Sequence, residues 1–147
     1  NVPADKIVLA TIFRAGLPFH NGFLNIFDHA GNAFVSAYRE YKDAAHHEVG
    51  IHVEYLATPD INGKTLIIAD PMLATGGSME LGYKGTPRHV HVACLLAAPE
   101  GIAHIGKTFP DSNTTIWCAA IDEKLNEHQY IVPGFGDAGD LCYGEKI

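Results

Sequence analysis

The sequence predicts an α/β fold with a mostly parallel sheet flanked by helices. Continuous apolar runs at residues 6–12 and 65–69 have the length of strands, and they lack the alternation of a half-exposed strand. Segments whose apolar residues follow a helical spacing lie between such runs, as they do in βαβ units. With 147 residues, the chain has the length of one domain, so we expect residues 1–147 to form a single unit.

The expected elements alternate along most of the chain. The expected strands cover residues 6–12, 33–38, 51–57, 65–69, 89–96 and 115–120. The expected helices cover residues 17–27 and 99–109, and a further helix begins near Gly77. The polar stretch 39–50 joins two strands, which predicts a β-hairpin with a flexible arm. Residues 121–147 are irregular and rich in glycine, so we expect a C-terminal loop region there.

Composition and charge narrow the function classes. Ten Lys and Arg residues against seventeen Asp and Glu residues give a net charge of −7, which disfavours a nucleic-acid binder. The three cysteines are widely spaced and form no disulfide or zinc pattern, which favours a reducing cytoplasm. The apolar stretches are too short to cross a bilayer. Because the chain begins at Asn1 without Met, we expect that its N-terminal segment is lacking.

The segment from Thr65 to Ser78 predicts a phosphate-binding loop. A buried strand ends in Asp70, and a loop containing Thr75, Gly76 and Gly77 then opens a helix. Ligands of open α/β folds bind at this edge of the sheet, where glycine N–H groups and the helix dipole favour phosphate. Asp70 is placed to face ribose hydroxyls. The alternative is a strand–turn–helix whose glycines serve only the turn.

The C-terminal loop is a candidate site for a flat heterocycle. Three glycines and a proline between residues 133 and 139 specify a main chain that turns sharply and exposes its peptide groups. Such groups can match the donors and acceptors along the edge of a base, and a mismatched base would leave a buried group unpaired. The alternative is a structural turn. A calcium loop is disfavoured because the acidic spacing is wrong.

Arg14 follows the first expected strand and could bind diphosphate oxygens through two N–H groups. The alternative for Arg14 is a solvent-exposed position at the sheet edge. Two histidine pairs, at residues 46–47 and at residues 89 and 91, have no third ligand at a recognisable spacing, so we assign no transition metal.

These motifs together resemble the uracil phosphoribosyltransferases, which are type I phosphoribosyltransferases. Residues 70–78 read Asp-Pro-Met-Leu-Ala-Thr-Gly-Gly-Ser, as the uracil enzymes do. Residues 130–140 read Tyr-Ile-Val-Pro-Gly-Phe-Gly-Asp-Ala-Gly-Asp and are similar to the family's uracil-binding segment. Residues 12–16 read Ile-Phe-Arg-Ala-Gly, against Ile-Leu-Arg-Ala-Gly in the family. The resemblance runs from Val8 to Gly144 in collinear order.

The resemblance implies the roles of particular residues. It makes Arg14, Asp70 and Asp137 catalytic, and it implies that Mg²⁺ binds mainly through the diphosphate, so that no residue is assigned as a direct ligand. Many members of the family have an Arg at the position of Leu141. This chain therefore has no counterpart of that Arg at this position. The implied uracil-binding residues are Ile131, Gly136, Asp137 and Ala138. The implied phosphoribosyl diphosphate-binding residues are Arg14, Asp70, Pro71, Met72, Leu73, Ala74, Thr75, Gly76, Gly77, Ser78 and Asp137.

The implied reaction converts uracil and 5-phospho-α-D-ribose 1-diphosphate to UMP and diphosphate, a step of pyrimidine salvage. Two alternatives stay open: a phosphoribosyltransferase for another base, and a regulatory RNA-binding relative that keeps the pocket. The resemblance also implies a homodimer or homotetramer in the cytoplasm and raises GTP as an effector. It implies no nucleic-acid or membrane partner. Members of the family carry further sequence before the Arg14 strand, including a second diphosphate-binding arginine.

Overall fold

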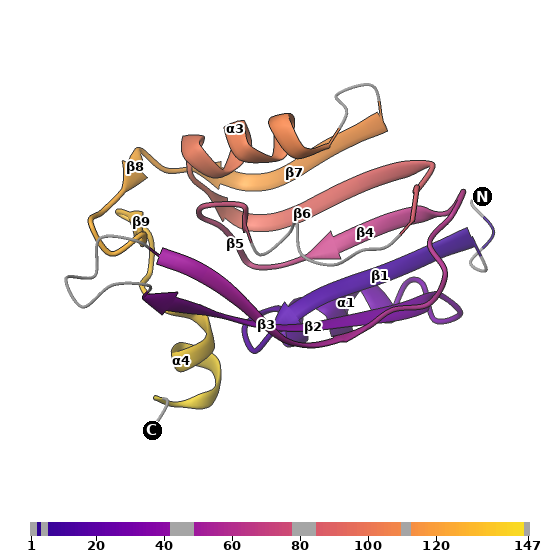
Figure 1. Cartoon of the computed structure of the whole chain (residues 1–147). Coiled ribbons are helices and arrows are strands. Elements are labelled where there is room, and N and C mark those ends of the chain that lie inside the picture. Colours follow the sequence, from indigo (N-terminus) through magenta and orange to yellow (C-terminus); the bar gives the residue numbers. More distant parts are fainter. Residues whose placement is uncertain (1–2, 4–5, 42–48, 78–84, 110–112, 146–147) are drawn as a thin grey trace.

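The computed structural model describes residues 3, 6–41, 49–77, 85–109 and 113–145, and these residues form one main sheet with helices on both faces (Figure 1). The helices are α1 (Gly16–Leu24), α3 (Pro99–Thr108) and α4 (Ala138–Tyr143). The strands of the main sheet are β1 (Ile7–Phe13), β2 (Gly31–Tyr41), β3 (Val49–Ala57), β4 (Thr65–Ala69), β5 (Met72–Leu73), β6 (His89–Ala97) and β7 (Thr114–Ile121). β8 (Lys124–Leu125) and β9 (Ile131–Val132) form a small second sheet.

The main sheet is mostly parallel, as predicted. Its order is β3-β2-β1-β4-β6-β5, and β7 pairs with β6. β1 pairs in parallel with β2 and β4, and β6 pairs in parallel with β4, β5 and β7. β2 and β3 are antiparallel and confirm the predicted hairpin. The C-terminal ends of β1 and β4 therefore point to one edge, and Figure 1 shows β8, β9 and α4 at that same edge.

Two apolar clusters lie on the two faces of the sheet. On one face, buried residues such as Val8 and Ile68 pack with Ile105 of α3. On the other face, Leu9 and Ile67 pack with Phe23 of α1. Neighbouring residues of a strand point to opposite faces, so one continuous apolar run can supply both clusters. Each fully buried Leu, Ile or Val side chain contributes about 1.5–3 kcal/mol, which fixes the strand ends in place.

The face that carries α1 is covered over β1 and β4 but open over β6 and β7 among the described residues. Leu95, Trp117 and Ile121 are exposed there by 44, 59 and 59%. The indole Nε1 of Trp117 donates a hydrogen bond of 3.1 Å to Nδ1 of His91. The continuous apolar runs therefore predicted more coverage of this face than the described helices provide.

Several predicted bounds differ from the observed ones. α1 ends at Leu24 instead of Phe27, because turns at residues 25–30 bring the Phe27 side chain to the α1 cluster without a further helical turn. The hairpin strands are longer than expected, while residues 42–48 of the predicted arm lie outside the described residues. Residues 78–84, where the helix after Gly77 was expected, also lie outside them. The sequence did not predict the two-residue strand β5.

Candidate active site

The ends of β1 and β4 place Arg14 and Asp70 at the same edge of the sheet. Thr11 of β1 is paired with Ala69 of β4 in the parallel register. Arg14 lies three residues after Thr11, and Asp70 lies one residue after Ala69. The buried Thr11 hydroxyl also donates a hydrogen bond to the Ala69 carbonyl oxygen. The side chains predicted to bind diphosphate and ribose thus emerge from two adjacent and tightly paired strands.

The loop after β4 is fixed by the end of β6. The Asp70 N–H donates to the Ala93 carbonyl oxygen at 3.1 Å. The Pro71 carbonyl oxygen accepts from the N–H groups of Leu95 and Leu96 at 2.9 and 3.1 Å. The Leu73 carbonyl oxygen accepts from the Ala98 N–H at 2.9 Å. These bonds hold β5 beside β6, further along the same strand that β4 pairs with.

The Thr75–Gly76–Gly77 turn rests on the start of α3. Gly76 has a φ of +80°, which an L side chain rarely adopts. A Cβ on Gly101 of α3 would lie 2.5 Å from the Ala74 carbonyl oxygen and 2.7 Å from the Leu73 carbonyl oxygen. The Thr75 hydroxyl accepts from the Gly77 N–H at 3.5 Å. Ser78, the last predicted phosphate ligand, lies outside the described residues.

The carboxyl group of Asp70 sits in a poorly solvated position. Burial raises its pKa from the ordinary value of 3.8 to about 7, although a hydrogen bond from the Met72 N–H at 3.2 Å works in the opposite direction. In the free protein, this carboxyl is therefore close to half-protonated at neutral pH. A hydroxyl donor or a cation brought in by a ligand would favour the charged form.

The first part of the C-terminal segment is held by its own backbone bonds. β8 and β9 pair as a short antiparallel hairpin, and Ile131 in β9 is buried. The Asp122 carboxylate accepts from the Gly134 N–H at 2.9 Å. Gly134 has a φ of +54°, and a Cβ there would lie 2.1 Å from the Ile131 carbonyl oxygen. The predicted base-binding segment is thus a turn that requires glycine.

The second part of the segment leads into α4. Gly136 has a φ of +83° and open space around it. Asp137 is the N-cap of α4, since its Oδ1 accepts from the Asp140 N–H at 2.9 Å. The N–H of Ala138, the first residue of the helix, is one of the N–H groups without an intrahelical acceptor. This arrangement offers backbone donors to a ligand at residues 136–138.

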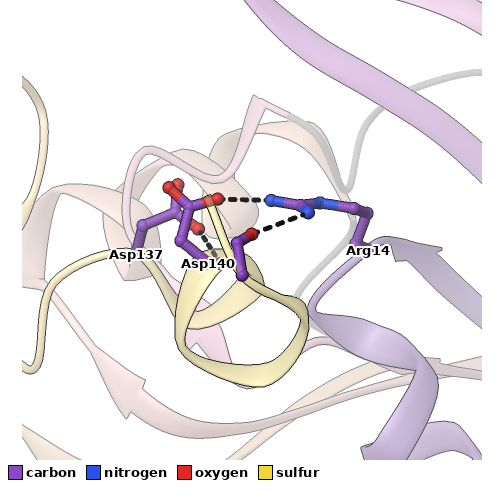
Figure 2. Close-up of polar contacts among 4 residues, drawn as sticks. Arg14, Asp137 and Asp140 are labelled. Atoms are coloured by element: carbon purple, nitrogen blue, oxygen red, sulfur yellow. Dashed lines mark hydrogen bonds and ion pairs between the residues drawn. The ribbon is translucent and has the colours of Figure 1, made fainter. Parts of the chain in front are cut away.

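An ion pair joins the turn after β1 to the C-terminal segment. The Arg14 Nη2 contacts the Asp140 carboxylate, and the Arg14 Nη1 donates to the Gly144 carbonyl oxygen at 3.1 Å (Figure 2). Figure 2 also shows the Asp137 carboxylate beside this pair. Arg14, predicted to bind diphosphate, is therefore engaged by the segment predicted to bind the base.

A cavity of about 420 Å³ lies between the same segments. Pro71 of the loop after β4 and Ala138 of the C-terminal segment both line it. The loop after β4 and the C-terminal segment therefore share a cavity wall, while residues 75–77 are anchored to α3. The lining residues are almost all apolar: Ala15, Pro18, Phe19, Pro71, Leu95, Phe135, Ala138, Leu141 and Cys142.

Two structural contacts of the site were missed in the sequence. Asp140 received no separate role, and its ion pair with Arg14 spans 126 positions, which no local pattern reports. The spacing of Asp137 and Asp140 is that of an N-cap and the third helical residue, so it could have predicted α4. Gly101 was treated as an ordinary helical residue, although the loop backbone packs against it.

The carboxylates of the site suit a hard cation that arrives with its substrate. Within the described ranges, no group of three or more His, Cys, Asp and Glu residues could hold a metal ion. Asp137 supplies a carboxylate at the site, and Mg²⁺ commonly uses one or two carboxylates with phosphate and water as its other ligands.

The fold is that of the type I phosphoribosyltransferases. A hypoxanthine phosphoribosyltransferase from Staphylococcus aureus shares the fold with a TM-score of 0.56 at 16% identity, over 82% of this chain and 64% of that one. A protein from Aquifex aeolicus is more similar, with a TM-score of 0.85 at 34% identity over 100% of this chain and 69% of that one.

Sequence comparisons identify the family. The family model for uracil phosphoribosyltransferase matches residues 1–145. The chain is 61% identical over 152 residues to a uracil phosphoribosyltransferase from Porphyromonas gingivalis, covering 100% of this chain and 69% of the relative. It is 40% identical to one from Pyrococcus furiosus, covering 97% of this chain and 61% of the relative. The chain belongs to the uracil phosphoribosyltransferase family. Its described helices are all too short or too polar to cross a membrane.

Proposed function

We propose that the protein transfers a phosphoribosyl group from 5-phospho-α-D-ribose 1-diphosphate to uracil and releases UMP and diphosphate. The observation that carries this proposal is the 61% identity with a uracil phosphoribosyltransferase across the whole chain. The relatives are longer, and this chain spans 69 and 61% of the two that are described above. The activity is therefore assigned to the full-length protein.

The turns at the sheet edge would bind the phosphoribosyl diphosphate. Backbone N–H groups at residues 75–77 and the Thr75 hydroxyl would hold the 5-phosphate, since glycines let the main chain approach closely. Asp70 would accept hydrogen bonds from ribose hydroxyls, and this contact would favour its charged form. Arg14 would bind the diphosphate through two N–H groups, as a guanidinium does with phosphate oxygens.

The C-terminal segment would hold uracil. Backbone groups at Ile131, Gly136 and Ala138 would meet the O–N–H–O edge of the ring, and the glycine-dependent turn at Gly134 would fix their positions. A base with a different pattern of donors would leave a buried peptide group unpaired, which supports discrimination. Asp137 would orient the bound metal, as the family resemblance implies.

The reaction requires little covalent work from the protein. The uracil N1 would form a bond to ribose C1 as the bond from C1 to the diphosphate breaks, so positive charge develops on the ribose, and the N1 proton would pass to water. Holding the two reactants in line supplies much of the acceleration, and Arg14 stabilises the leaving diphosphate. A Mg²⁺ ion bound to the diphosphate would supply further positive charge for the leaving group.

An assay of the full-length protein tests the proposal. Uracil, phosphoribosyl diphosphate and Mg²⁺ are incubated with the protein, and UMP is quantified by chromatography. We expect UMP to form with the wild type and to fall by about a hundredfold or more with Asp137→Ala. Because Ala also removes the N-cap of α4, Asp137→Asn is the matched variant that keeps a capping side chain. A full-length protein that makes no UMP would overturn the proposal.

A competition of bases tests the choice of substrate. The fold also accommodates hypoxanthine enzymes, so the sheet does not select the base. With uracil, hypoxanthine, adenine and orotate present together, we expect uridine monophosphate to dominate the products. A dominant purine nucleotide or orotate product would show that the protein uses a base other than uracil.

The remaining expectations concern assembly and regulation. We propose a homodimer or homotetramer in the cytoplasm, on the basis of the family resemblance. Analytical ultracentrifugation of the full-length protein measures the assembly, and a monomer at assay concentration would contradict it. The same UMP assay with and without GTP tests the effector.

A further inference from the structure

The guanidinium group of Arg14 contacts the turn at residues 138–144, and its side chain is 34% exposed. Its Nη2 contacts the Asp140 carboxylate and its Nη1 donates to the Gly144 carbonyl oxygen at 3.1 Å (Figure 2). A Cβ on Gly139 would lie 3.6 Å from both Nε and Nη2, so the remaining edge of the guanidinium faces the backbone at Gly139. The C-terminal turn thus contacts both terminal nitrogens of Arg14.

The donors in these contacts are the ones that a diphosphate would need. A guanidinium binds phosphate oxygens in a two-point contact through adjacent N–H groups. A carboxylate and a phosphate oxygen on the same donors would repel each other, because both are negatively charged. The Asp140 contact and a two-point diphosphate contact at Arg14 therefore exclude each other. This step rests on the proposed function, in which Arg14 binds the diphosphate.

The turn is held by few buried contacts, so it can release Arg14. Ala138 and Gly139 are the buried residues of α4, whereas Leu141 and Tyr143 are exposed by 69 and 49%. The side of α4 that faces the protein lines the cavity of about 420 Å³. A segment with little buried apolar surface opens at low cost in free energy. The ion pair with Arg14 is one of the contacts that attach this turn to the end of β1.

We propose that Asp140 is a positioning residue that competes with the diphosphate for Arg14. In the free protein, Asp140 holds the guanidinium at the site. When the diphosphate binds, it takes over the guanidinium, and Asp140 recovers Arg14 as the diphosphate leaves. The exchange keeps Arg14 neutralised in the absence of ligand and weakens the retention of the released diphosphate.

Calorimetric binding of inorganic pyrophosphate with Mg²⁺ to the full-length protein tests this exchange. We expect Asp140→Asn to bind pyrophosphate about three to ten times more tightly than the wild type, because the competitor has lost its charge. Asp140→Glu keeps the charge and should stay within about twofold of the wild type. If Asp140→Asn does not fold, Asp140→Ser replaces it and carries the same expectation.

Two controls separate competition from a general change of charge. Glu145→Gln removes an exposed negative charge from the same segment and should leave pyrophosphate affinity unchanged. In an Arg14→Ala background, Asp140→Asn should have no further effect on pyrophosphate, since its action requires the guanidinium. Unchanged or weaker binding by Asp140→Asn, or an equal gain in the Arg14→Ala background, would overturn the inference.

The outcomes distinguish this inference from the proposed function. If the wild type makes UMP and binds pyrophosphate while Asp140→Asn binds it no more tightly, only the role of Asp140 is wrong. If the wild type neither makes UMP nor binds pyrophosphate, the proposed function fails and the inference fails with it. In steady-state assays, a competing Asp140 also predicts that Asp140→Asn lowers the KM for phosphoribosyl diphosphate and strengthens inhibition by pyrophosphate.

Discussion

The Thr11 hydroxyl donates a hydrogen bond of 3.2 Å to the carbonyl oxygen of Ala69, which ties the end of β1 to the end of β4. Thr11 is fully buried, so no water competes for this bond. Arg14 lies three residues after Thr11 along the chain, and Asp70 lies one residue after Ala69. The bond therefore sets the spacing between the group proposed to bind the diphosphate and the group proposed to bind the ribose.

Replacing Thr11 tests that spacing. Thr11→Val removes the hydroxyl donor, and we expect the free energy of unfolding to fall by about 1 kcal/mol. Because Arg14 and Asp70 lose a shared anchor, kcat/KM should fall by about threefold to tenfold. Thr11→Ser keeps the hydroxyl and is the matched control for the activity. Equal kcat/KM for Thr11→Val and Thr11→Ser would show that the bond does not position the site.

Gly16 packs against the same bond. A Cβ at Gly16 would lie 2.1 Å from the Thr11 hydroxyl oxygen and 2.9 Å from the Ala69 carbonyl oxygen. Gly16→Ala should therefore displace both groups, lower the free energy of unfolding by about 1–3 kcal/mol and reduce activity. Gly22→Ala in the same helix meets no atom within 4 Å and should be neutral or slightly stabilising. Thermal unfolding and the UMP assay measure both variants, and similar behaviour of the two would contradict the packing role.

Gly101 lies where α3 meets the loop after β4. A Cβ there would approach the carbonyl oxygens of Leu73 and Ala74 to 2.7 and 2.5 Å, so Gly101→Ala must shift the loop backbone. We expect the KM for phosphoribosyl diphosphate to rise by about tenfold, because a misplacement of about 1 Å is costly at a binding site. The KM for uracil should change much less, since the three atoms nearest to that Cβ belong to Leu73 and Ala74 in the loop after β4. A proportionate rise in both KM values would indicate general damage instead.

The raised pKa of Asp70 predicts a pH dependence of stability. The pKa is about 7 in the folded protein and 3.8 for an ordinary Asp, so folding favours the protonated carboxyl. This contribution is fully present below the ordinary pKa and is lost as the pH rises through the folded-state value. Asp70→Asn removes the titration. We expect the unfolding free energy of the wild type to fall relative to Asp70→Asn between about pH 4 and about pH 7.

Urea denaturation of both proteins across this pH range measures that difference. The control is Asp60→Asn, which removes a carboxyl group from an exposed position. Parallel curves for the wild type and Asp70→Asn would show that the Asp70 carboxyl is not buried as described.

The sequence predicted what depends on local patterns. Apolar runs gave the strand at residues 65–69 with its observed bounds, since a parallel strand buried on both faces leaves a continuous apolar signal. The glycines at 76 and 134 have positive φ angles, so the turns read from them are required by the backbone.

The sequence could not predict contacts between distant residues. The pairing of Arg14 with Asp140 depends on how the fold places β1 and α4 in space. The sequence around either residue does not indicate the other as its partner. The exposure of Trp117 in β7 was missed because an apolar strand reads as buried whether or not a helix covers it. β5 is only two residues long, and it forms because β6 supplies its hydrogen-bond partners. A strand this short leaves no recognisable pattern in the sequence.

Binding of UMP tests the central claim that the loop after β4 and the C-terminal segment form one site. UMP carries a phosphate for the first segment and a uracil ring for the second. Gly76→Ala strains the phosphate turn at its positive φ. Ala138→Pro removes a backbone N–H at the first position of α4, where proline is tolerated.

The measurement is the calorimetric affinity of the full-length protein for UMP and for uridine. The account predicts that Gly76→Ala weakens UMP binding by about tenfold or more and leaves uridine binding nearly unchanged, whereas Ala138→Pro weakens both. Equal affinities of the wild type for UMP and uridine, with UMP binding unaffected by Gly76→Ala, would contradict a shared site.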